Sequence, residues 1–368
     1  MKIDNYELNH PDRIDTPAMI TYRHIVEQNI SEIINLAGGA DRIVPHAKTH
    51  KSSDVLKMQI DSGIKSFKCA TLNEAEMVVR GGADEIIMAY PLIHPMKLER
   101  LDTLISEFPD VSIRCIVSME AHLEKLSDVM VRSGNEIGVY MDLDTGMRRT
   151  GVQPGDESDI FYEKILQYKN IEPIGVHVFD GETLYLEDSV LRKHMVESNF
   201  TKMESIWNHA AKKDIPVTDN LAGGSWSFRY YLGKDNVRAT PGTWIYWDAR
   251  NAKIDDLNFQ IASLILGQVV DEDPEMDTVT LDIGSKASSS DQPLEHRFKV
   301  VGCPNAIVVA QSEEHGVVKL NGDTLKVGDY VLAAPGHACT MTVKFPFTHV
   351  VSNGGDVVGQ FNHDARDR

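Results

Sequence analysis

The sequence has few cysteines, and it lacks long apolar runs. The four cysteines, Cys69, Cys115, Cys303 and Cys339, are far apart and form no Cys-x-x-Cys pair, which argues against a disulfide framework. No segment approaches the roughly 20 apolar residues that span a bilayer. The first residues, MKIDNYELNHPDRIDTP, hold no apolar run of signal-peptide length. We therefore expect a cytoplasmic protein that does not act at membranes.

Positive charge is also scarce. The chain has 37 Lys and Arg against 55 Asp and Glu, a formal net charge of −18. An acidic surface repels phosphate-rich polymers, and no Lys/Arg run offsets it. We expect no general affinity for nucleic acid, so any phosphate ligand must be held by a local site.

The first two thirds of the 368 residues alternate short β-rich runs with longer helical patterns. That alternation is typical of repeated βα units. Eight such units predict an α/β protein with a (β/α)8 TIM barrel over residues 16–249. The expected strands are RIVPHAK, SFKCA, EIIMAY, SIRCIVS, IGVYMDLD, PIGVHVF, PVTDNLAG and VRATPGTWI, preceded by an extra strand and helix in AMITYRHIVEQNISEIINLA.

After Asp248 the helical patterns disappear. Short strand-like runs such as SLILGQVV, TVTLDIGS and MTVKF follow one another, and KLNGDTLKV is typical of a hairpin with an Asn-Gly turn. We expect a C-terminal all-β domain over residues 250–368, joined by residues 1–15.

The stretch PHAKTHK sets basic side chains close together. If it continues a strand, His46, Lys48 and His50 share one face and point into the barrel near its carboxyl end, whereas Lys51 is a bystander. A partly desolvated lysine there has a lowered pKa, which makes Lys48 a candidate Schiff-base amine. The same residues are equally compatible with a solvated loop.

Two further motifs are candidates for ligand binding in the barrel. DNLAGGSWSF places a Gly-Gly-Ser turn after a late strand, where backbone N–H groups often hold phosphate, although a lone Gly-Gly is more often a plain turn. MDLDTGMRRTG sets Asp142 and Asp144 beside Arg148 and Arg149, either as a structural ion-pair network or to hold a carboxylate or a heterocycle.

The segment AAPGHACTM places His337 and Cys339 two residues apart. On a strand or at its end, both side chains leave the same face about 6 to 7 Å apart. Imidazole and thiolate together favour zinc, and two protein ligands leave positions open for water or substrate. The alternative is a buried histidine beside an inert core thiol.

Taken together, these motifs resemble those of the D-threonine aldolase and D-serine dehydratase group, pyridoxal-phosphate enzymes of the alanine-racemase fold type. The shared motifs are PHAKTHK, DLDTGMRRTG, LAGGS, TPGTWIYWD, LDIGSKASSSD, QSEEHG and PGHAC, which occur in the family's order over residues 45–339.

The resemblance implies a role for each matching residue. Lys48 is the lysine that bonds to pyridoxal 5'-phosphate, and Arg149 contacts its ring. The turn of Gly223, Gly224 and Ser225 holds the phosphate, with Tyr246 nearby. His337 and Cys339 bind a divalent metal; a cysteine here is similar to the zinc-dependent dehydratases, although manganese or magnesium remains an alternative.

One departure from the family pattern concerns the segment VHVFDGETL. Phe179 and Glu182 stand where the family often has a tyrosine and a Gly-His. A hydroxyl and an imidazole are therefore missing near the cofactor, and His177 is an open candidate to replace one of them.

We therefore predict a lyase that acts on small D-β-hydroxy amino acids. The first expectation is D-serine dehydratase-type β-elimination, and D-threonine aldolase-type retro-aldol cleavage, with a base such as His50, is nearly equal. An amino-acid racemase and a non-catalytic pyridoxal-phosphate-binding protein are the alternatives. By resemblance alone, the enzyme is expected to be a homodimer.

Overall fold

The computed structural model describes residues 1–368. The chain divides into two compact units, each described here by itself. The β unit comprises Met1–Ile33, Thr49–Val55 and Thr243–Asp367, and the barrel unit comprises Ile34–Lys48, Leu56–Gly242 and Arg368. The predicted boundaries, 16–249 and 250–368, differ from this division because residues 16–33, 49–55 and 243–249 belong to the β unit.

Seven parallel strands of the barrel unit form one sheet in the order β10-β9-β8-β7-β6-β5-β4. Two isolated parallel bridges, Ile43 to Ala239 and His46 to Lys68, join residues 43–46 to both edges of this sheet. These residues act as the eighth strand and close the sheet, so the predicted barrel is confirmed. The seven strands are β4 (Ser66–Cys69), β5 (Glu85–Met88), β6 (Ser112–Val117), β7 (Ile137–Leu143), β8 (Ile171–Val178), β9 (Leu221–Ala222) and β10 (Arg238–Ala239).

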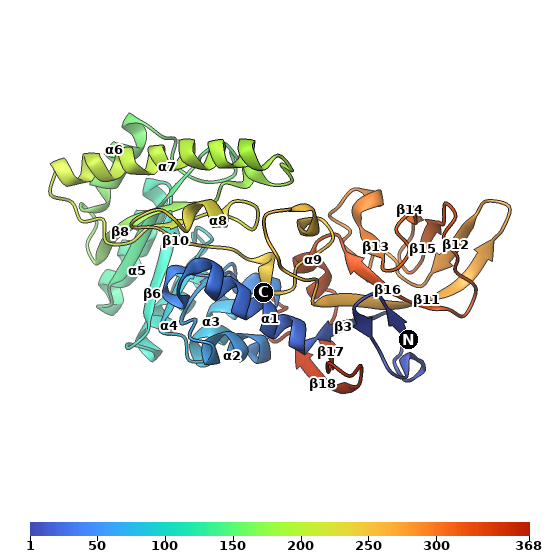
Figure 1. Ribbon diagram of the computed structural model, residues 1–368. Helices are drawn as coiled ribbons and strands as arrows, with labels where there is room; N and C mark the ends of the chain where they lie inside the picture. The colour runs from blue at the N-terminus through green and yellow to red at the C-terminus, as the bar shows by residue number, and fades with distance from the viewer. The chain divides into compact units, whose positions relative to one another are not determined.

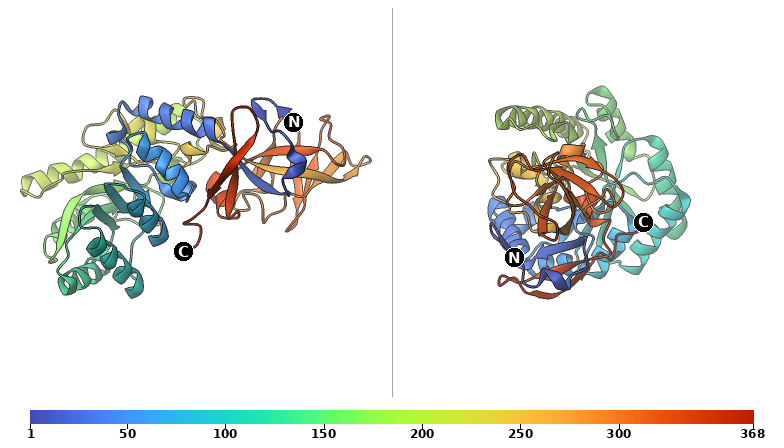
Figure 2. Two further views of the ribbon diagram at one scale, coloured as in Figure 1. Left: turned by 90° about the horizontal axis from the view of Figure 1, so that it is seen from below. Right: turned by 90° about the vertical axis from the view of Figure 1, so that its right-hand side faces the viewer.

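Helices connect successive barrel strands and lie outside them (Figures 1 and 2). In one of them the Thr71 hydroxyl caps the first turn by accepting the Glu74 N–H (3.2 Å), and Leu72, Ala75 and Val79 face the core. None of the helices combines the length and the apolar character needed to span a bilayer. The helices are α1 (Arg23–Ala37), α2 (Ser53–Asp61), α3 (Leu72–Arg80), α4 (Pro95–Glu107), α5 (Glu120–Ser133), α6 (Asp156–Ile165), α7 (Ser189–Lys212) and α8 (Phe228–Tyr231).

The β unit is organised around the long strand β11 (Ser263–Asp273), which pairs with three others. Its first half pairs with β3 (Ala18–Tyr22) and β16 (Tyr330–Pro335), and its second half pairs with β12 (Thr278–Leu281). The extra N-terminal strand is therefore part of the β unit and not of the barrel; Figure 1 shows β3 in dark blue among the orange and red strands. The remaining strands are β1 (Lys2–Ile3), β2 (Tyr6–Glu7), β13 (Phe298–Val300), β14 (Ile307–Gln311), β15 (Gly316–Lys319), β17 (Phe347–Val351) and β18 (Val357–Asn362).

Two expectations for the β unit are wrong. The run MTVKF is not a strand, because residues up to 342 complete the short helix α9 (Ala338–Thr342). The Asn-Gly turn has the expected positive φ values, +50° at Asn321 and +96° at Gly322, but it does not close a hairpin. β15 pairs with β12 and β14 instead of the strand that follows the turn, so the turn conformation did not decide the pairing.

Candidate functional site

The extended segment that begins the site ends before Lys48. His46 bridges to Lys68, and Ala47–Thr49 then form a short 3-10 helix. The expectation that strand alternation places Lys48 and His50 on one face is therefore wrong. Lys48 is half-buried, and its backbone N–H donates to Nδ1 of His46 (3.4 Å).

Three of the predicted cofactor residues converge on Phe179, which follows β8. Nζ of Lys48 lies 5.9 Å from the centroid of the Phe179 ring, and Cζ of Arg149 lies 4.7 Å from it. Gly224 lies against the same ring, because a Cβ added there would be 3.1 Å from Cε2 of Phe179. Phe179, which stands where the family often has a tyrosine, thus supplies an aromatic surface in the predicted site.

Glycine is required at the start of the predicted phosphate-binding turn. Gly223 has a φ of +92°, and an added Cβ would lie 2.9 Å from a backbone atom of α8. The N–H of Gly224 donates to Oγ of Ser227 (2.9 Å), which donates to Oδ1 of Asp180 (2.7 Å). Burial raises the pKa of Asp180 to about 6. Ser225 is buried in the turn, and phosphate binding by this turn stays a prediction.

Lys68, His177 and Asp142 form a buried hydrogen-bonded chain inside the barrel. Nζ of Lys68 lies 2.9 Å from Nε2 of His177, and Nδ1 of His177 lies 2.7 Å from Oδ1 of Asp142. Lys68 also donates to Oγ1 of Thr240 (3.1 Å), which donates to the carbonyl oxygen of Gly223 (2.7 Å). This series of hydrogen bonds therefore reaches Gly223 in the predicted phosphate-binding turn.

The protonation of this chain follows from its surroundings. Burial, together with the charges of Lys48 and Arg149, lowers the pKa of Lys68 to about 7. Burial and the Lys68 charge also lower the pKa of His177. Burial opposes ionisation of Asp142, but the hydrogen bonds from His177 and Thr150, together with the neighbouring Lys68 charge, outweigh burial and lower the pKa of Asp142. At neutral pH Asp142 is thus a carboxylate, and neutral His177 donates to it through Nδ1.

Sequence reasoning did not single out Lys68, although a signal was present. Lys68 lies in the strand Ser66–Cys69 of a parallel barrel, where both faces of a strand are covered. Lysine is almost never fully buried without a partner. A lysine in such a strand therefore indicates a polar partner in the barrel interior.

The loop Thr49–Val55 belongs to the β unit, where the C-terminal segment holds it. Nδ1 of His50 accepts the N–H of Ser52 (3.2 Å), and burial lowers the pKa of His50 to about 3, which keeps the ring neutral. Nζ of Lys51 donates to the carbonyl oxygen of Ala365 (3.1 Å). The side chain of Lys51 is buried and ties this loop to the C-terminal segment, so it is not a solvated loop residue. Its expected lack of a chemical role stays a prediction.

His337 and Cys339 follow the end of β16 and open α9, so they lie just beyond a strand end, where a short helix begins. Nδ1 of His337 lies 2.6 Å from Oδ2 of Asp291, and a hydrogen bond joins the His337 and Cys339 side chains. Because Asp291 occupies Nδ1, Nε2 is the ring nitrogen left for a metal ion. Sγ of Cys339 also lies 3.1 Å from Oγ1 of Thr49, the residue after Lys48 in the sequence.

These donors fit a divalent metal with two protein ligands. Imidazole nitrogen and thiolate sulfur are donors that zinc prefers, and a carboxylate that holds the other ring nitrogen is the usual support for a ligating histidine. The structure has no group of three or more His, Cys, Asp or Glu that would hold a metal. Other coordination positions are therefore left to water or substrate. Asp291 was not predicted as a site residue, although it is the last residue of the motif LDIGSKASSSD.

The barrel interior likewise fits an anionic, planar cofactor. Lys48, Lys68 and Arg149 supply positive charge, Phe179 supplies an aromatic surface, and the turn at Gly223 excludes a side chain. The predicted role of Tyr246 stays a prediction. Tyr246 is fully buried in the β unit, where its carbonyl oxygen accepts the N–H of Ala262 (2.7 Å).

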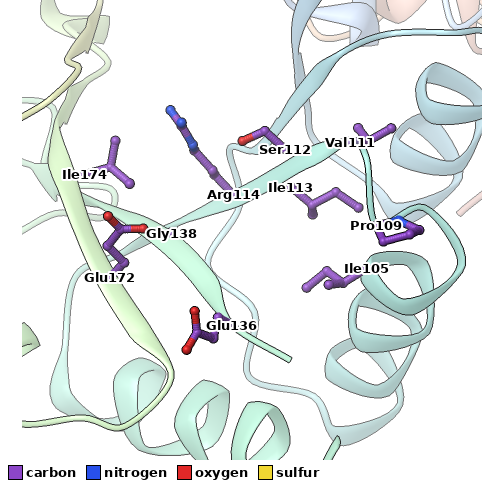
Figure 3. Close-up of a pocket in the computed structure, with 10 residues that line it drawn as sticks. All are labelled: Ile105, Pro109, Val111, Ser112, Ile113, Arg114, Glu136, Gly138, Glu172 and Ile174. Carbon is purple, nitrogen blue, oxygen red and sulfur yellow. The ribbon is translucent and has the colours of Figure 1, made fainter. Parts of the chain in front are cut away.

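A cavity of about 220 Å³ lies at the opposite end of the barrel strands, at the amino ends of β6, β7 and β8 (Figure 3). Arg114 lies on its wall, but Nη1 of Arg114 pairs with Glu85 (2.8 Å) and donates to the Tyr140 hydroxyl (2.8 Å). Its charge is thus already neutralised, and enzymes of this architecture place their chemistry at the other end. The lining residues are Ile105, Pro109, Val111, Ser112, Ile113, Arg114, Glu136, Gly138, Glu172 and Ile174.

Comparison with known families decides the classification. Residues 23–248, more than half of the chain, match the family model described as the alanine racemase N-terminal domain. The chain belongs to that family. Residues 262–351 match a second model, described as a putative serine dehydratase domain.

Individual relatives cover nearly the whole chain. The 3-hydroxy-D-aspartate aldolase of Paracoccus denitrificans (strain Pd 1222) is 25% identical over 88% of this chain and 85% of that protein. The D-serine dehydratase of Dictyostelium discoideum is 22% identical, with 98% of each chain covered. The crystal structure of D-threonine aldolase from Filomicrobium marinum has a TM-score of 0.87 at 22% identity, covering 100% of this chain and 98% of that one.

The resemblance to the D-threonine aldolase and D-serine dehydratase group is therefore confirmed. This family member is a pyridoxal-phosphate-dependent enzyme of the lyase type.

Proposed function

We propose that this lyase uses pyridoxal phosphate and a divalent metal, zinc by preference, to cleave small D-amino acids that carry a β-hydroxyl group. The observation that carries the proposal is the pairing of His337 and Cys339, with Asp291 on the far nitrogen of the imidazole. The names of the relatives support it, since a D-serine dehydratase, a D-threonine aldolase and a 3-hydroxy-D-aspartate aldolase share this substrate chemistry.

The barrel residues bind and orient the cofactor. Lys48 supplies the primary amine that bonds to the cofactor aldehyde. Arg149 and the Phe179 ring flank that amine, and the backbone of the turn at Gly223 and Gly224 receives the phosphate. When bound, pyridoxal phosphate supplies an electron sink for the bond that breaks at Cα.

His337 and Cys339 are the residues proposed to act on the β-hydroxyl. Asp291 accepts the proton on Nδ1 of His337, which leaves the Nε2 lone pair for a metal, and Cys339 adds a thiolate. A divalent metal held by these two residues would supply Lewis acidity toward the substrate hydroxyl.

β-Elimination of the dehydratase type is the first proposal, and retro-aldol cleavage is a close second. A divalent metal held by His337 and Cys339 would supply Lewis acidity to a hydroxide leaving group, and Lys48 would be the base that removes the α-proton. Retro-aldol cleavage needs a base for the hydroxyl proton. A pKa of about 3 makes His50 a weak base for that step, which supports the stated order.

Three substrates separate the two reactions. D-serine, D-threonine and D-3-hydroxyaspartate are incubated with the purified holoenzyme, and keto acid, ammonia, glycine and aldehyde are measured. Elimination releases pyruvate from D-serine and 2-oxobutyrate from D-threonine, together with ammonia. Release of glycine and acetaldehyde from D-threonine, without any keto acid, would reverse the proposed order.

An amino-acid racemase is the second candidate, because the family model that covers the barrel is that of alanine racemase. A racemase needs no metal, so exhaustive chelation distinguishes the two. Loss of lyase activity on chelation and its return with Zn²⁺ supports the proposal, whereas racemisation that persists unchanged without metal favours the second candidate. Metal analysis of the same preparation tests whether the bound metal is zinc. Sedimentation tests whether the protein is a homodimer, as the resemblance implies.

A further inference from the structure

Lys68 is a second lysine in the barrel interior, and the roles proposed above do not use it. It lies on β4, opposite His46 in the strand register, and only 2% of its surface is exposed. Burying a lysine is unfavourable unless its amine is paired. Its position beside the predicted cofactor residues is therefore informative.

The hydrogen bonds of Lys68 allow its amine to gain a proton. Asp142 accepts the proton on Nδ1 of His177, so Nε2 of His177 is an acceptor and Lys68 donates to it. Thr240 donates its own proton to Gly223, so it too accepts from Lys68. A neutral amine has two N–H groups and an ammonium has three. Protonation therefore adds a donor without breaking either bond.

The charges around Lys68 come from three parts of the barrel. Lys48 approaches from the first strand segment, Asp142 and Arg149 come from β7 and the loop after it, and Asp180 follows β8. Burial and the two neighbouring cations lower the pKa of Lys68 to about 7 in the protein without cofactor. An anion that binds in this cluster reverses the effect of the cations and favours the charged amine.

We propose that Lys68 is a second lysine of the cofactor site, which takes up one proton from solvent when the anionic cofactor binds. The proton adds to the lone pair of Nζ, and no other bond forms or breaks. His177, held by Asp142, is a positioning residue that keeps the Lys68 amine in place. The inference rests on the proposed cofactor site but involves no amino-acid substrate and no metal, so its test is separate from the test of the lyase reaction.

Calorimetry in two buffers of different ionisation enthalpy tests proton uptake directly. The full-length protein without cofactor is titrated with pyridoxine 5'-phosphate, which carries an alcohol in place of the aldehyde and cannot bond to Lys48. At about pH 8, above the Lys68 pKa, the wild type should take up more protons than Lys68→Met, by up to about one per site. At about pH 6 Lys68 is already protonated, so the difference should vanish.

The variant Lys68→Arg keeps the positive charge at this position but cannot gain or lose the proton. Arginine stays charged at every accessible pH, so Lys68→Arg should retain affinity for pyridoxine 5'-phosphate but lose the extra proton uptake. Lys68→Met should weaken binding by about tenfold. Lys57→Met, which changes an exposed lysine of α2, should match the wild type in both measurements.

Equal proton uptake by the wild type and Lys68→Met at about pH 8 would overturn the proposal. So would uptake in Lys68→Arg equal to that of the wild type. Thermal melts of each variant show whether it is folded, and Lys68→Arg provides the comparison if Lys68→Met is not.

Discussion

The two ends of the barrel each hold a polar network, but their charge balance differs. At the amino ends of the strands, Arg114 and Arg238 face Glu85 and Asp219; Nη1 of Arg238 is 2.7 Å from Glu85, and its Nε is 3.0 Å from Asp219. The Tyr140 hydroxyl donates to the same Asp219 (2.5 Å). Two cations thus meet two carboxylates, and the network neutralises itself.

At the carboxyl ends the cations are in excess. Lys68 has two neighbouring cations, Lys48 and Arg149, and two neighbouring carboxylates, Asp142 and Asp180. Asp142 is already engaged by His177, and the pKa of Asp180 is raised to about 6 by burial. In a chain with a formal charge of −18, this local excess indicates a place for an anion. The balanced network is expected to stabilise the barrel, whereas the unbalanced one is expected to bind an anionic ligand.

Lys48→Ala is expected to have the largest effect at the carboxyl end. Without the primary amine the cofactor has no covalent attachment, so activity should fall by at least about 1,000-fold and the visible absorbance of the lysine-bound cofactor should disappear. Unfolding of the protein without cofactor should change little. Lys57→Ala is the matched control, and a surviving absorbance band would contradict the assignment of Lys48.

Arg238→Met is expected to lower stability and to leave activity unchanged, the reverse of Lys48→Ala. It leaves Glu85 and Asp219 with Arg114 as the remaining cation, so the free energy of unfolding should fall by about 3 kcal/mol, as measured by denaturant titration. The activity of the molecules that remain folded should be retained. Arg100→Met, which breaks an exposed pair with Glu76, should cost less than about 1 kcal/mol. Equal losses in the two variants would show that the balanced network does not stabilise the barrel.

Asp291→Asn tests the support of the metal ligands. The neutral amide no longer fixes the imidazole of His337 as the carboxylate does, so metal affinity should fall by about 10- to 100-fold in a metal-buffered titration. The exposed Asp128→Asn variant should bind metal as the wild type does. Unchanged affinity in Asp291→Asn would mean that the Asp291 carboxylate does not support metal binding by His337.

The pH dependence of stability should reveal the unbalanced charge of Lys68. The pKa of Lys68 is about 7 in the folded protein, against an ordinary value of 10.5 for a lysine, so the unfolded state binds more protons between these two pH values. The stability of the wild type relative to Lys68→Met should therefore rise with pH over this window, by at most about 1.4 kcal/mol per pH unit. Denaturant titrations at several pH values measure the difference, and a flat difference would show that Lys68 is protonated throughout.

Local patterns in the sequence predicted the repeating parts of the fold well. The alternation of strands and helices indicated the barrel, and the shared motifs pointed to Lys48, Arg149 and the glycine turn, which the structure brings together around Phe179. The prediction failed where pairing is long-range. Ala18–Tyr22 has the local character of any strand, and its place in the β unit depends on partners more than 240 residues away, such as Ser263 for Thr21.

The sequence by itself determined which chemical groups are present and the order of the secondary structure, because propensity and periodicity act over a few residues. Only the tertiary structure decided which groups share a site. Lys68 and His177 are 109 residues apart in the chain and 2.9 Å apart in the barrel, because parallel strands from different repeats direct their side chains into one interior. The same closure brings the cations of the carboxyl end together. Their mutual repulsion would be relieved by a bound anion, which favours anion binding there.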